Sequence, residues 1–266
     1  MTVTKSDAPR LPRDVSQPFL VAQLSDPHIG ADWAGGDPTA AFAAAIETIL
    51  TMPVRPHAVL LSGDLSEHAT DAEYEQVREL LAPLRVPVYP LPGNHDDRAT
   101  LRRQFELPGT ADEPVQYSVD LGPIRLVAVD TTIPLEIPGA FDLERLAWLD
   151  AELSAAPAAP TLVAMHHPAH TTGIPAWDEF GLARADQNAF VDLVARHPQV
   201  RRIVAGHFHR TIAAEIAGRP AMVVPSTYAQ LRLTFDSAAD FVHEPPGFAL
   251  HVAVDGELAS HVQPVL

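Results

Sequence analysis

Short apolar runs alternate with helix-like segments along the first two thirds of the chain. The runs are rich in Val, Leu and Ile, and most are apolar throughout, which is typical of strands buried on both faces. They predict strands at Phe19–Leu24, Ala58–Ser62, Val86–Leu91, Ile124–Asp130, Thr161–Met165 and Arg202–Ala205.

The segments between these runs predict helices. Asp37-Pro38 and Asp142 are typical of helix starts, because an acidic side chain caps free amides and proline suits the first turn. The predicted helices are Thr39–Thr51, Asp71–Leu84, Arg98–Phe105, Leu143–Ala155 and Gln187–Arg196. Strands that alternate with helices indicate a layered α/β fold.

After Thr211 the pattern changes to strands alone. The turns Gly218-Arg219 and Asp255-Gly256 suit hairpins between them. The predicted strands are Ile212–Ile216, Ala221–Val224, Phe248–Val254 and Leu258–Val262. The whole pattern predicts an α/β fold in four layers, an α/β/β/α sandwich of two mixed sheets flanked by helices.

The chain is predicted to form one domain over residues 19–266, preceded by a flexible arm over residues 1–18 that is polar and lacks an apolar signal core. Three loops contain proline and glycine and are long enough to be functional. We expect them to form a cap over a site: 131–141, 168–186 and 225–247.

Composition narrows the functional classes. The chain has 266 residues, no cysteine and a formal charge of −16. The missing thiols exclude disulfides and thiolate metal sites, and the acidic balance disfavours nucleic acid as a partner. No apolar stretch approaches the roughly 18 residues of a membrane span, so we expect a cytoplasmic protein without a membrane partner. A phosphate substrate would need local positive charge, which bound metal ions supply.

Five short polar motifs follow five predicted strands, in order. Each alone is typical of an ordinary turn. Together they would converge on one edge of the sheets, because ligands bind at the carboxyl ends of α/β strands. The motifs are Asp26-Pro27-His28, Gly63-Asp64, Gly93-Asn94-His95-Asp96, His166-His167-Pro168 and Gly206-His207-Phe208-His209.

These residue types offer mixed oxygen and nitrogen ligands, which suit Mn, Fe, Co, Ni or Zn. If Asp64 bridges two ions, the set provides two four-ligand sites with room for water or substrate. The glycines of the motifs suit turns that bring the backbone close to the ions. The candidate ligands are Asp26, His28, Asp64, Asn94, His166, His207 and His209.

The ordered motif set resembles the calcineurin-like metallophosphoesterases over about Leu20 to Val254. The variant Gly-Asn-His-Asp-Asp-Arg, with His-His-Pro and Gly-His-Phe-His, is most similar to the class III cyclic nucleotide phosphodiesterases and related bacterial glycerophosphodiesterases. The resemblance implies a binuclear centre, with iron or manganese favoured over zinc, cobalt or nickel, and a homo-oligomer. It implies that one metal is held by Asp26, His28 and His209, the other by Asn94, His166 and His207, with Asp64 bridging.

The chemistry expected of such a centre is in-line attack on phosphorus by a metal-bound hydroxide. We expect His95 to donate a proton to the leaving group and Asp96 to orient its ring, while His167 lies behind the ligands or faces substrate. The resemblance favours hydrolysis of 3′,5′-cyclic nucleotides, cyclic AMP first and cyclic GMP second, to nucleoside 5′-monophosphates. Glycerophosphodiesters or a broad range of phosphodiesters stay open. The complete ligand set disfavours a non-catalytic scaffold.

Overall fold

The computed structural model describes residues 17–111, 113–235, 239–242 and 244–266. Residues 1–16 of the predicted arm and the loop histidine His243 lie outside the described residues. Within the described part, no helix has the length and apolar character needed to cross a membrane.

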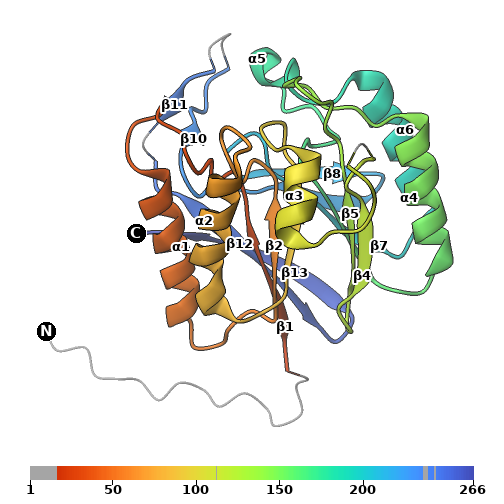
Figure 1. Ribbon diagram of the computed structural model, residues 1–266. Coiled ribbons are helices and arrows are strands. Elements are labelled where there is room, and N and C mark those ends of the chain that lie inside the picture. Colours follow the sequence, from red (N-terminus) through yellow and green to blue (C-terminus); the bar gives the residue numbers. More distant parts are fainter. Residues whose placement is uncertain (1–16, 112, 236–238, 243) are drawn as a thin grey trace, which may run out of the picture.

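The first sheet has five strands in the order β13-β12-β1-β2-β3. The strands β1, β2 and β3 run parallel, while β12 and β13 are antiparallel additions from the end of the chain. Figure 1 shows this sheet beside α1 and α2. The strands are β1 (Phe19–Leu24), β2 (Ala58–Ser62), β3 (Val88–Leu91), β12 (Gly247–Val254) and β13 (Glu257–Pro264).

The second sheet has six strands in the order β4-β5-β6-β7-β9-β8. Parallel pairing joins β5, β6, β7 and β9, and antiparallel strands lie at both edges. The strands are β4 (Tyr117–Asp120), β5 (Arg125–Val129), β6 (Thr161–Met165), β7 (Val200–Ala205), β8 (Ile212–Ile216) and β9 (Arg219–Val223). Both sheets are mixed, as predicted.

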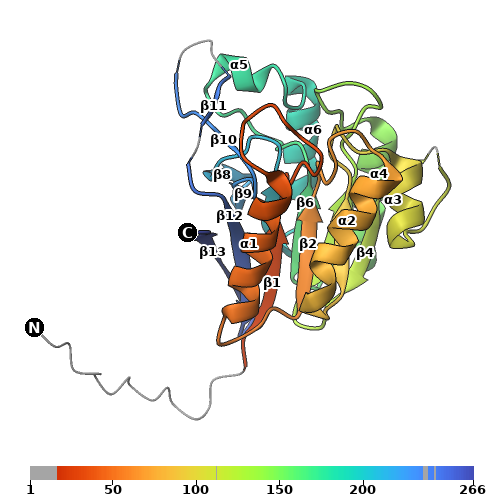
Figure 2. The same ribbon diagram turned by 60° about the vertical axis from the view of Figure 1, so that its left-hand side comes forward.

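The two sheets pack face to face and helices cover their outer faces. In β5, Leu126 and Ala128 are buried in the core shared with the first sheet, whereas Val127 and Val129 belong to the core under α4 and α6. This alternation follows from the two-residue repeat of a strand. Figures 1 and 2 show α1 and α2 on one side and α4 and α6 on the other. The predicted four-layer arrangement is confirmed.

The helices begin where the sequence supplies caps. The Asp37 side chain accepts two amides of α1 at Thr39 and Ala40, and Asp142 caps α4 through the Arg145 amide. The helices are α1 (Pro38–Thr51), α2 (Asp71–Leu81), α3 (Arg98–Phe105), α4 (Leu143–Ala155), α5 (Pro175–Asp178) and α6 (Arg184–Ala195).

Several predicted boundaries were wrong, and prolines explain two of them. The α2 ladder stops at Leu81 and continues as a 3₁₀ turn, Ala82–Leu84, because Pro83 has no amide to donate. For the same reason β3 begins after Pro87. The helix α6 starts at Arg184, after Ala183, which provides no capping side chain that the sequence could reveal.

Short elements inside the predicted loops were missed. The loop 168–186 contains α5, and the loop 225–247 contains a small hairpin of β10 (Gln230–Leu231) and β11 (Phe241–Val242). Figure 2 shows α5 and this hairpin at the end of the molecule toward which β1 and β2 run. The edge strand β4 was also missed, because its sequence, YSVD, is short and half polar.

Candidate metal centre

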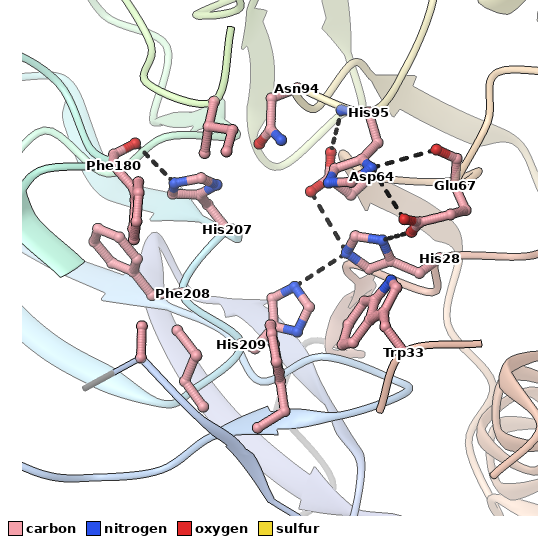
Figure 3. Close-up of a pocket in the computed structure, with 14 residues that line it drawn as sticks. His28, Trp33, Asp64, Glu67, Asn94, His95, Phe180, His207, Phe208 and His209 are labelled. Carbon is pink, nitrogen blue, oxygen red and sulfur yellow. Dashed lines mark hydrogen bonds and ion pairs between the residues drawn. The ribbon is translucent and has the colours of Figure 1, made fainter. Parts of the chain in front are cut away.

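The seven predicted ligands meet at the carboxyl ends of five strands. Three of these strands belong to the first sheet and two to the second, so the centre lies at the junction of both sheets. Figure 3 shows five of the seven around one pocket. Asp26 and His28 follow β1, Asp64 follows β2, Asn94 follows β3, His166 follows β6, and His207 and His209 follow β7.

The first group of side chains is almost wholly buried and consists of Asp26, His28, Asp64 and His209. The Nε2 atoms of His28 and His209 are 3.1 Å apart. The Asp26 Oδ1 atom lies 3.4 Å from His209 Nε2, and Asp64 Oδ2 lies 3.5 Å from His28 Nε2. Four potential ligand atoms therefore surround one point.

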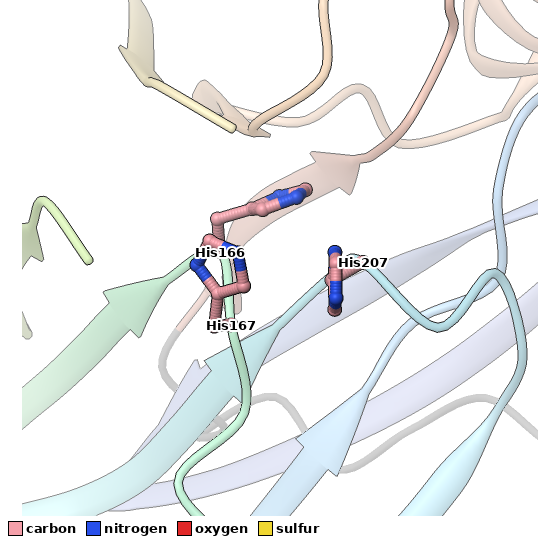
Figure 4. A group of neighbouring side chains, drawn as sticks. All are labelled: His166, His167 and His207. Carbon is pink, nitrogen blue, oxygen red and sulfur yellow. The ribbon is translucent and has the colours of Figure 1, made fainter. Parts of the chain in front are cut away.

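The second group consists of Asn94, His166 and His207. The Nε2 atom of His166 is 3.2 Å from the amide oxygen of Asn94 and 3.3 Å from Asp64 Oδ2. The ring of His207 lies edge-on to that of His166, with 5.0 Å between the ring centroids (Figure 4). Because Asp64 approaches both groups, its carboxylate is placed to bridge two ions.

The spacing of these atoms fits divalent ions. Ligands bound to zinc at about 2.0–2.1 Å in a tetrahedron lie about 3.3 Å from one another, close to the separations found here. Two imidazole lone pairs facing each other at 3.1 Å, as in His28 and His209, would repel without a cation between them. The donor set therefore fits the binuclear centre that the motifs imply, although the ligand roles themselves stay predictions.

The tautomers of three histidines agree with this reading. Each presents Nδ1 to an oxygen that can only accept, which places the proton on Nδ1 and leaves the Nε2 lone pair for a metal. Each Nδ1 lies 2.8 Å from its partner oxygen, which is Glu67 Oε2 for His28, the Ser62 carbonyl for His166 and the Ala229 carbonyl for His209.

His207 is turned the other way round. Its Nε2 donates to the carbonyl of Phe180 at 2.9 Å, so Nδ1 is the atom free to bind metal. His167, which lies beside His207 in Figure 4, is buried and contacts the loop 131–141. Its Nε2 donates to the Ile137 carbonyl at 2.9 Å, and its Nδ1 accepts from Thr131 Oγ1 at 2.8 Å. Both of its ring nitrogens are occupied, so His167 anchors a loop rather than binding metal.

The backbone is strained where the ligands lie. Asp26, His28, Asp64, His207 and His209 have φ values of +52°, +46°, +50°, +71° and +43°, and they make up five of the eleven described non-glycine residues with positive φ. Such left-handed conformations are uncommon outside glycine and concentrate at functional sites. All five residues follow the end of a strand and carry candidate ligands.

Two motif glycines are required by close approach. A Cβ at Gly93 would lie 2.1 Å from Asp64 Oδ1, and a Cβ at Gly63 would lie 2.2 Å from His166 Nδ1. Gly63 also has a φ of +95°. Glycine at these positions lets neighbouring backbone pass against the candidate ligands, as the sequence predicted.

Comparison with known proteins agrees with this geometry. Residues 19–211 match the model of the calcineurin-like phosphoesterases. The chain belongs to this family. It is 31% identical over 242 residues to a probable glycerophosphodiester phosphodiesterase, GpdQ, of Arcobacter nitrofigilis, covering 88% of each chain.

A second relative is the 3′,5′-cyclic adenosine monophosphate phosphodiesterase CpdA of Pseudomonas aeruginosa. It is 29% identical over 253 residues, which cover 92% of this chain and 90% of CpdA. Among solved structures, a dimetal phosphatase from Danio rerio is similar with a TM-score of 0.65 and 17% identity, covering 93% of this chain and 99% of that one. At that identity the likeness supports the fold alone.

The electrostatics of this phosphoesterase's site favour bound cations. Burial alone would raise the pKa of the Asp64 carboxyl, but the charge of His166, followed by that of His28, holds the pKa well below its usual range. Burial would lower the pKa of His166, whereas the Asp64 and Asp26 carboxylates raise it to about 9, so a bound cation would take the place of the Nε2 proton. The carboxylates are therefore ionised and draw positive charge to themselves, as a metal centre requires.

His95 lies at the edge of the first group, with its ring centroid 4.8 Å from that of His28. Its backbone amide donates to Asp64 Oδ1 at 2.9 Å, and its ring lines the pocket. The Nδ1 atom is 3.3 Å from the Glu67 carbonyl and 3.6 Å from Glu67 Oε1. The Nε2 side of the ring is left to face the pocket.

The expected contact between Asp96 and the His95 ring was wrong. The Asp96 carboxylate instead accepts from Tyr74 Oη at 2.9 Å and from the amides of Gly93, Leu65 and Ser66. Four donors already occupy its two oxygens, so Asp96 fixes the turn that carries Asn94 and His95. The carboxylate beside the His95 ring is Glu67.

Sequence reasoning missed Glu67 and the aromatic walls of the pocket. Glu67 lies three residues after Asp64, and this closeness to a candidate metal ligand is the only feature of the sequence that could have indicated its role. The walls come from segments with no recognisable code. They include Trp33 and Phe180, which lie in two separate loops, and Phe241, which lies in the short strand β11.

Proposed function

We propose that this phosphoesterase hydrolyses 3′,5′-cyclic nucleotides to nucleoside 5′-monophosphates with two divalent metal ions. Family membership and the names of its relatives support the broader activity, a metal-dependent hydrolase of phosphodiesters. The observation that carries the narrower proposal is the pocket over the metal centre. It has a volume of about 390 Å³, with candidate metal ligands as its floor and largely apolar and aromatic walls.

The size and chemistry of this pocket suit one small organic phosphate. Pockets of about 300–1,000 Å³ enclose ligands of drug-like size, and a few polar groups among apolar walls fix their orientation. Three of the wall residues are Trp33, Phe180 and Phe241. A cyclic phosphate joined to a nucleoside combines an anionic end for the metal floor with a flat, weakly polar end for the walls.

When bound, the two ions supply Lewis-acid activation of water and neutralise the charge of the phosphate oxygens. The residues of the chain hold and orient the participants. Asp64 spans the two ligand groups, and Glu67 fixes the ring of His28 with its Nε2 directed at the centre. We propose that His95, whose ring lines the pocket, gives a proton to the alkoxide that leaves phosphorus.

The donor types also limit the metals. Imidazole, carboxylate and amide oxygen together suit manganese, iron, zinc, cobalt or nickel. We propose iron or manganese as the resident ions, in line with the resemblance of the motif set. Elemental analysis of protein purified without chelators, with two ions expected per chain, tests this choice.

Glycerophosphodiesters are the second candidate, because the relative from Arcobacter nitrofigilis carries that name. Initial rates should be measured for cyclic AMP, cyclic GMP, glycerophosphocholine, bis-p-nitrophenyl phosphate and p-nitrophenyl phosphate, with added manganese and after chelation. We expect kcat/KM for a cyclic nucleotide to exceed that for glycerophosphocholine by at least about tenfold, or about 1.4 kcal/mol in transition-state binding. The reverse order would refute cyclic nucleotides as the substrate while leaving phosphodiester hydrolysis in place.

A further inference from the structure

Exposed aromatic side chains gather at this pocket. The exposed aromatic side chains among the described residues are those of Trp33, Phe180, Phe235 and Phe241. Three of them line the pocket over the metal centre, with exposures of 39% for Trp33, 37% for Phe180 and 41% for Phe241. Exposed aromatic surface is costly in water, so its concentration beside the centre points to a ligand that covers it.

Two of the three rings form one continuous wall. The ring centroids of Trp33 and Phe241 are 4.3 Å apart and their planes are inclined by 44°. Tyr228 packs edge-on against Trp33, with 5.3 Å between centroids, and its hydroxyl donates to the Gly35 carbonyl at 3.1 Å. Trp33 is therefore supported by Tyr228 from the loop 225–247, and the hydroxyl of Tyr228 ties that loop to the one that carries Trp33.

This wall stands directly beside the first ligand group. The Trp33 ring lies 5.2 Å from that of His28, and the Phe241 ring lies 5.4 Å from that of His209. His95 flanks His28 as well, at 4.8 Å. Figure 3 shows Trp33 on the side of His28 and His209, and Phe180 across the pocket beside His207. A group resting on Trp33 is thus on the same side as the proposed proton donor.

The shape of the wall distinguishes between two kinds of ligand. Recognition of a quaternary ammonium group uses several aromatic faces that enclose one point. Trp33 and Phe241 pack against each other and present a surface rather than an enclosure. The nearby carboxylate, Glu67, is already engaged by His28 and His95. A flat, uncharged ring system matches this surface better than a cation does.

We propose that Trp33 and Phe241 form a subsite that stacks the planar ring system of the alcohol that leaves phosphorus. The inference rests on the proposed function, in which that ring system is the base of a cyclic nucleotide. Trp33 and Phe241 determine specificity in this subsite, whereas the metal ligands and His95 act on the phosphate.

The test compares Trp33→Leu, which keeps apolar bulk but loses the flat ring, with Trp33→Phe, which restores a ring. Trp148→Phe is the matched control, because Trp148 is half-buried on α4 and packs against the core under α4 and α6. Loss of stacking is expected to raise KM for cyclic AMP roughly 10- to 100-fold in Trp33→Leu. Little change is expected in kcat, in metal content or in KM for glycerophosphoethanolamine, which has no ring, and Trp33→Phe should recover most of the loss.

Binding of the product provides a readout without turnover. Adenosine 5′-monophosphate should quench the tryptophan fluorescence of the wild-type protein and of Trp148→Phe, but not that of Trp33→Leu. If the wild type fails to hydrolyse cyclic nucleotides yet shows this quenching, the subsite stands and the proposed substrate falls. Unchanged KM for cyclic AMP in Trp33→Leu would overturn the subsite while the proposed function stands. An equal rise in KM for glycerophosphocholine would overturn the preference for planar groups.

Discussion

Glu67 offers a sharp test of how the metal centre is held. Its Oε2 accepts the Nδ1 proton of His28 at 2.8 Å, and the side chain is only 13% exposed. The contact fixes both the tautomer and the direction of the imidazole, so the lone pair of Nε2 faces the first metal position. Replacement by glutamine keeps the shape of the side chain and removes its charge.

The expected effect follows from this one hydrogen bond. A hydrogen bond to a charged group contributes about 1.5–3 kcal/mol, and one between neutral groups about 0.5–1.5 kcal/mol. The difference of about 1.4 kcal/mol corresponds to a tenfold weaker metal affinity in Glu67→Gln. Glu67→Ala, which removes the contact altogether, should lose affinity by up to about a hundredfold.

The assay is competition for metal with a chromophoric chelator, and circular dichroism checks that the variant is folded. Glu73→Gln is a close control. The Oε1 atom of Glu73 also meets a histidine Nδ1 at 2.8 Å, that of His68, and its side chain is 12% exposed. His68, however, is not a candidate ligand. Equal affinities for Glu67→Gln and the wild type, or equal losses in both glutamine variants, would refute the reasoning.

Four further results are expected. Asp64→Ala should lose both ions, because Asp64 Oδ2 lies within 3.5 Å of His28 Nε2 in one ligand group and of His166 Nε2 in the other, and two ions per chain by elemental analysis would contradict this. The site that contains Asn94 should empty first under a mild chelator, since a neutral amide oxygen is the weakest donor, and simultaneous loss of both ions would count against it. His95→Ala should keep both metals and lose roughly 10²–10⁴ in kcat on cyclic AMP, with a much smaller loss on bis-p-nitrophenyl phosphate, whose leaving group needs little protonation. Burial and, after it, the charge of Arg202 lower the pKa of His251 to about 3, whereas the pKa in the unfolded chain is about 6.5. Between these two values only the unfolded chain binds the proton, so the free energy of unfolding decreases as the pH drops from about 6.5 toward 3. His251→Gln should reduce this slope by up to about 1.4 kcal/mol per pH unit, measured by urea unfolding between pH 4.5 and 6.

The candidate site could be predicted largely because its side chains follow strands. Strands such as Phe19–Leu24 and Thr161–Met165 are largely continuous apolar runs, and a polar motif directly after such a run must lie at the carboxyl end of its strand. The resemblance of the ordered motifs then supplied the grouping of ligands. The rule that the carboxyl ends of parallel strands meet brings together the motifs within each sheet, and the packing of the two sheets then brings the two sets together.

What could not be predicted depends on contacts between distant segments. The ring of His207 is reversed because the carbonyl of Phe180, in a loop without regular sequence pattern, accepts its Nε2 proton. The sequence placed Asp96 beside His95 by adjacency alone, whereas the fold gives Asp96 four other donors and brings Glu67 to the ring. Such choices are decided by tertiary hydrogen bonding, which local sequence does not encode.

The pocket combines two kinds of structure with different freedom to change. Its floor is made of strand ends, where a substitution such as one at Gly93 would drive a Cβ into Asp64. Its aromatic walls come from two loops and from the two-residue strand β11 inside a third long connection, and such connections tolerate changes in sequence and length far better than the central strands do. Chemistry and substrate choice are thus held by separate parts of the chain. Two relatives of similar identity to this protein, at 31% and 29%, carry the names of different phosphodiester substrates, which is what such a separation predicts. Under the subsite proposal, Trp33 and Phe241 determine the substrate, whereas the members of the metal motifs act on the phosphate.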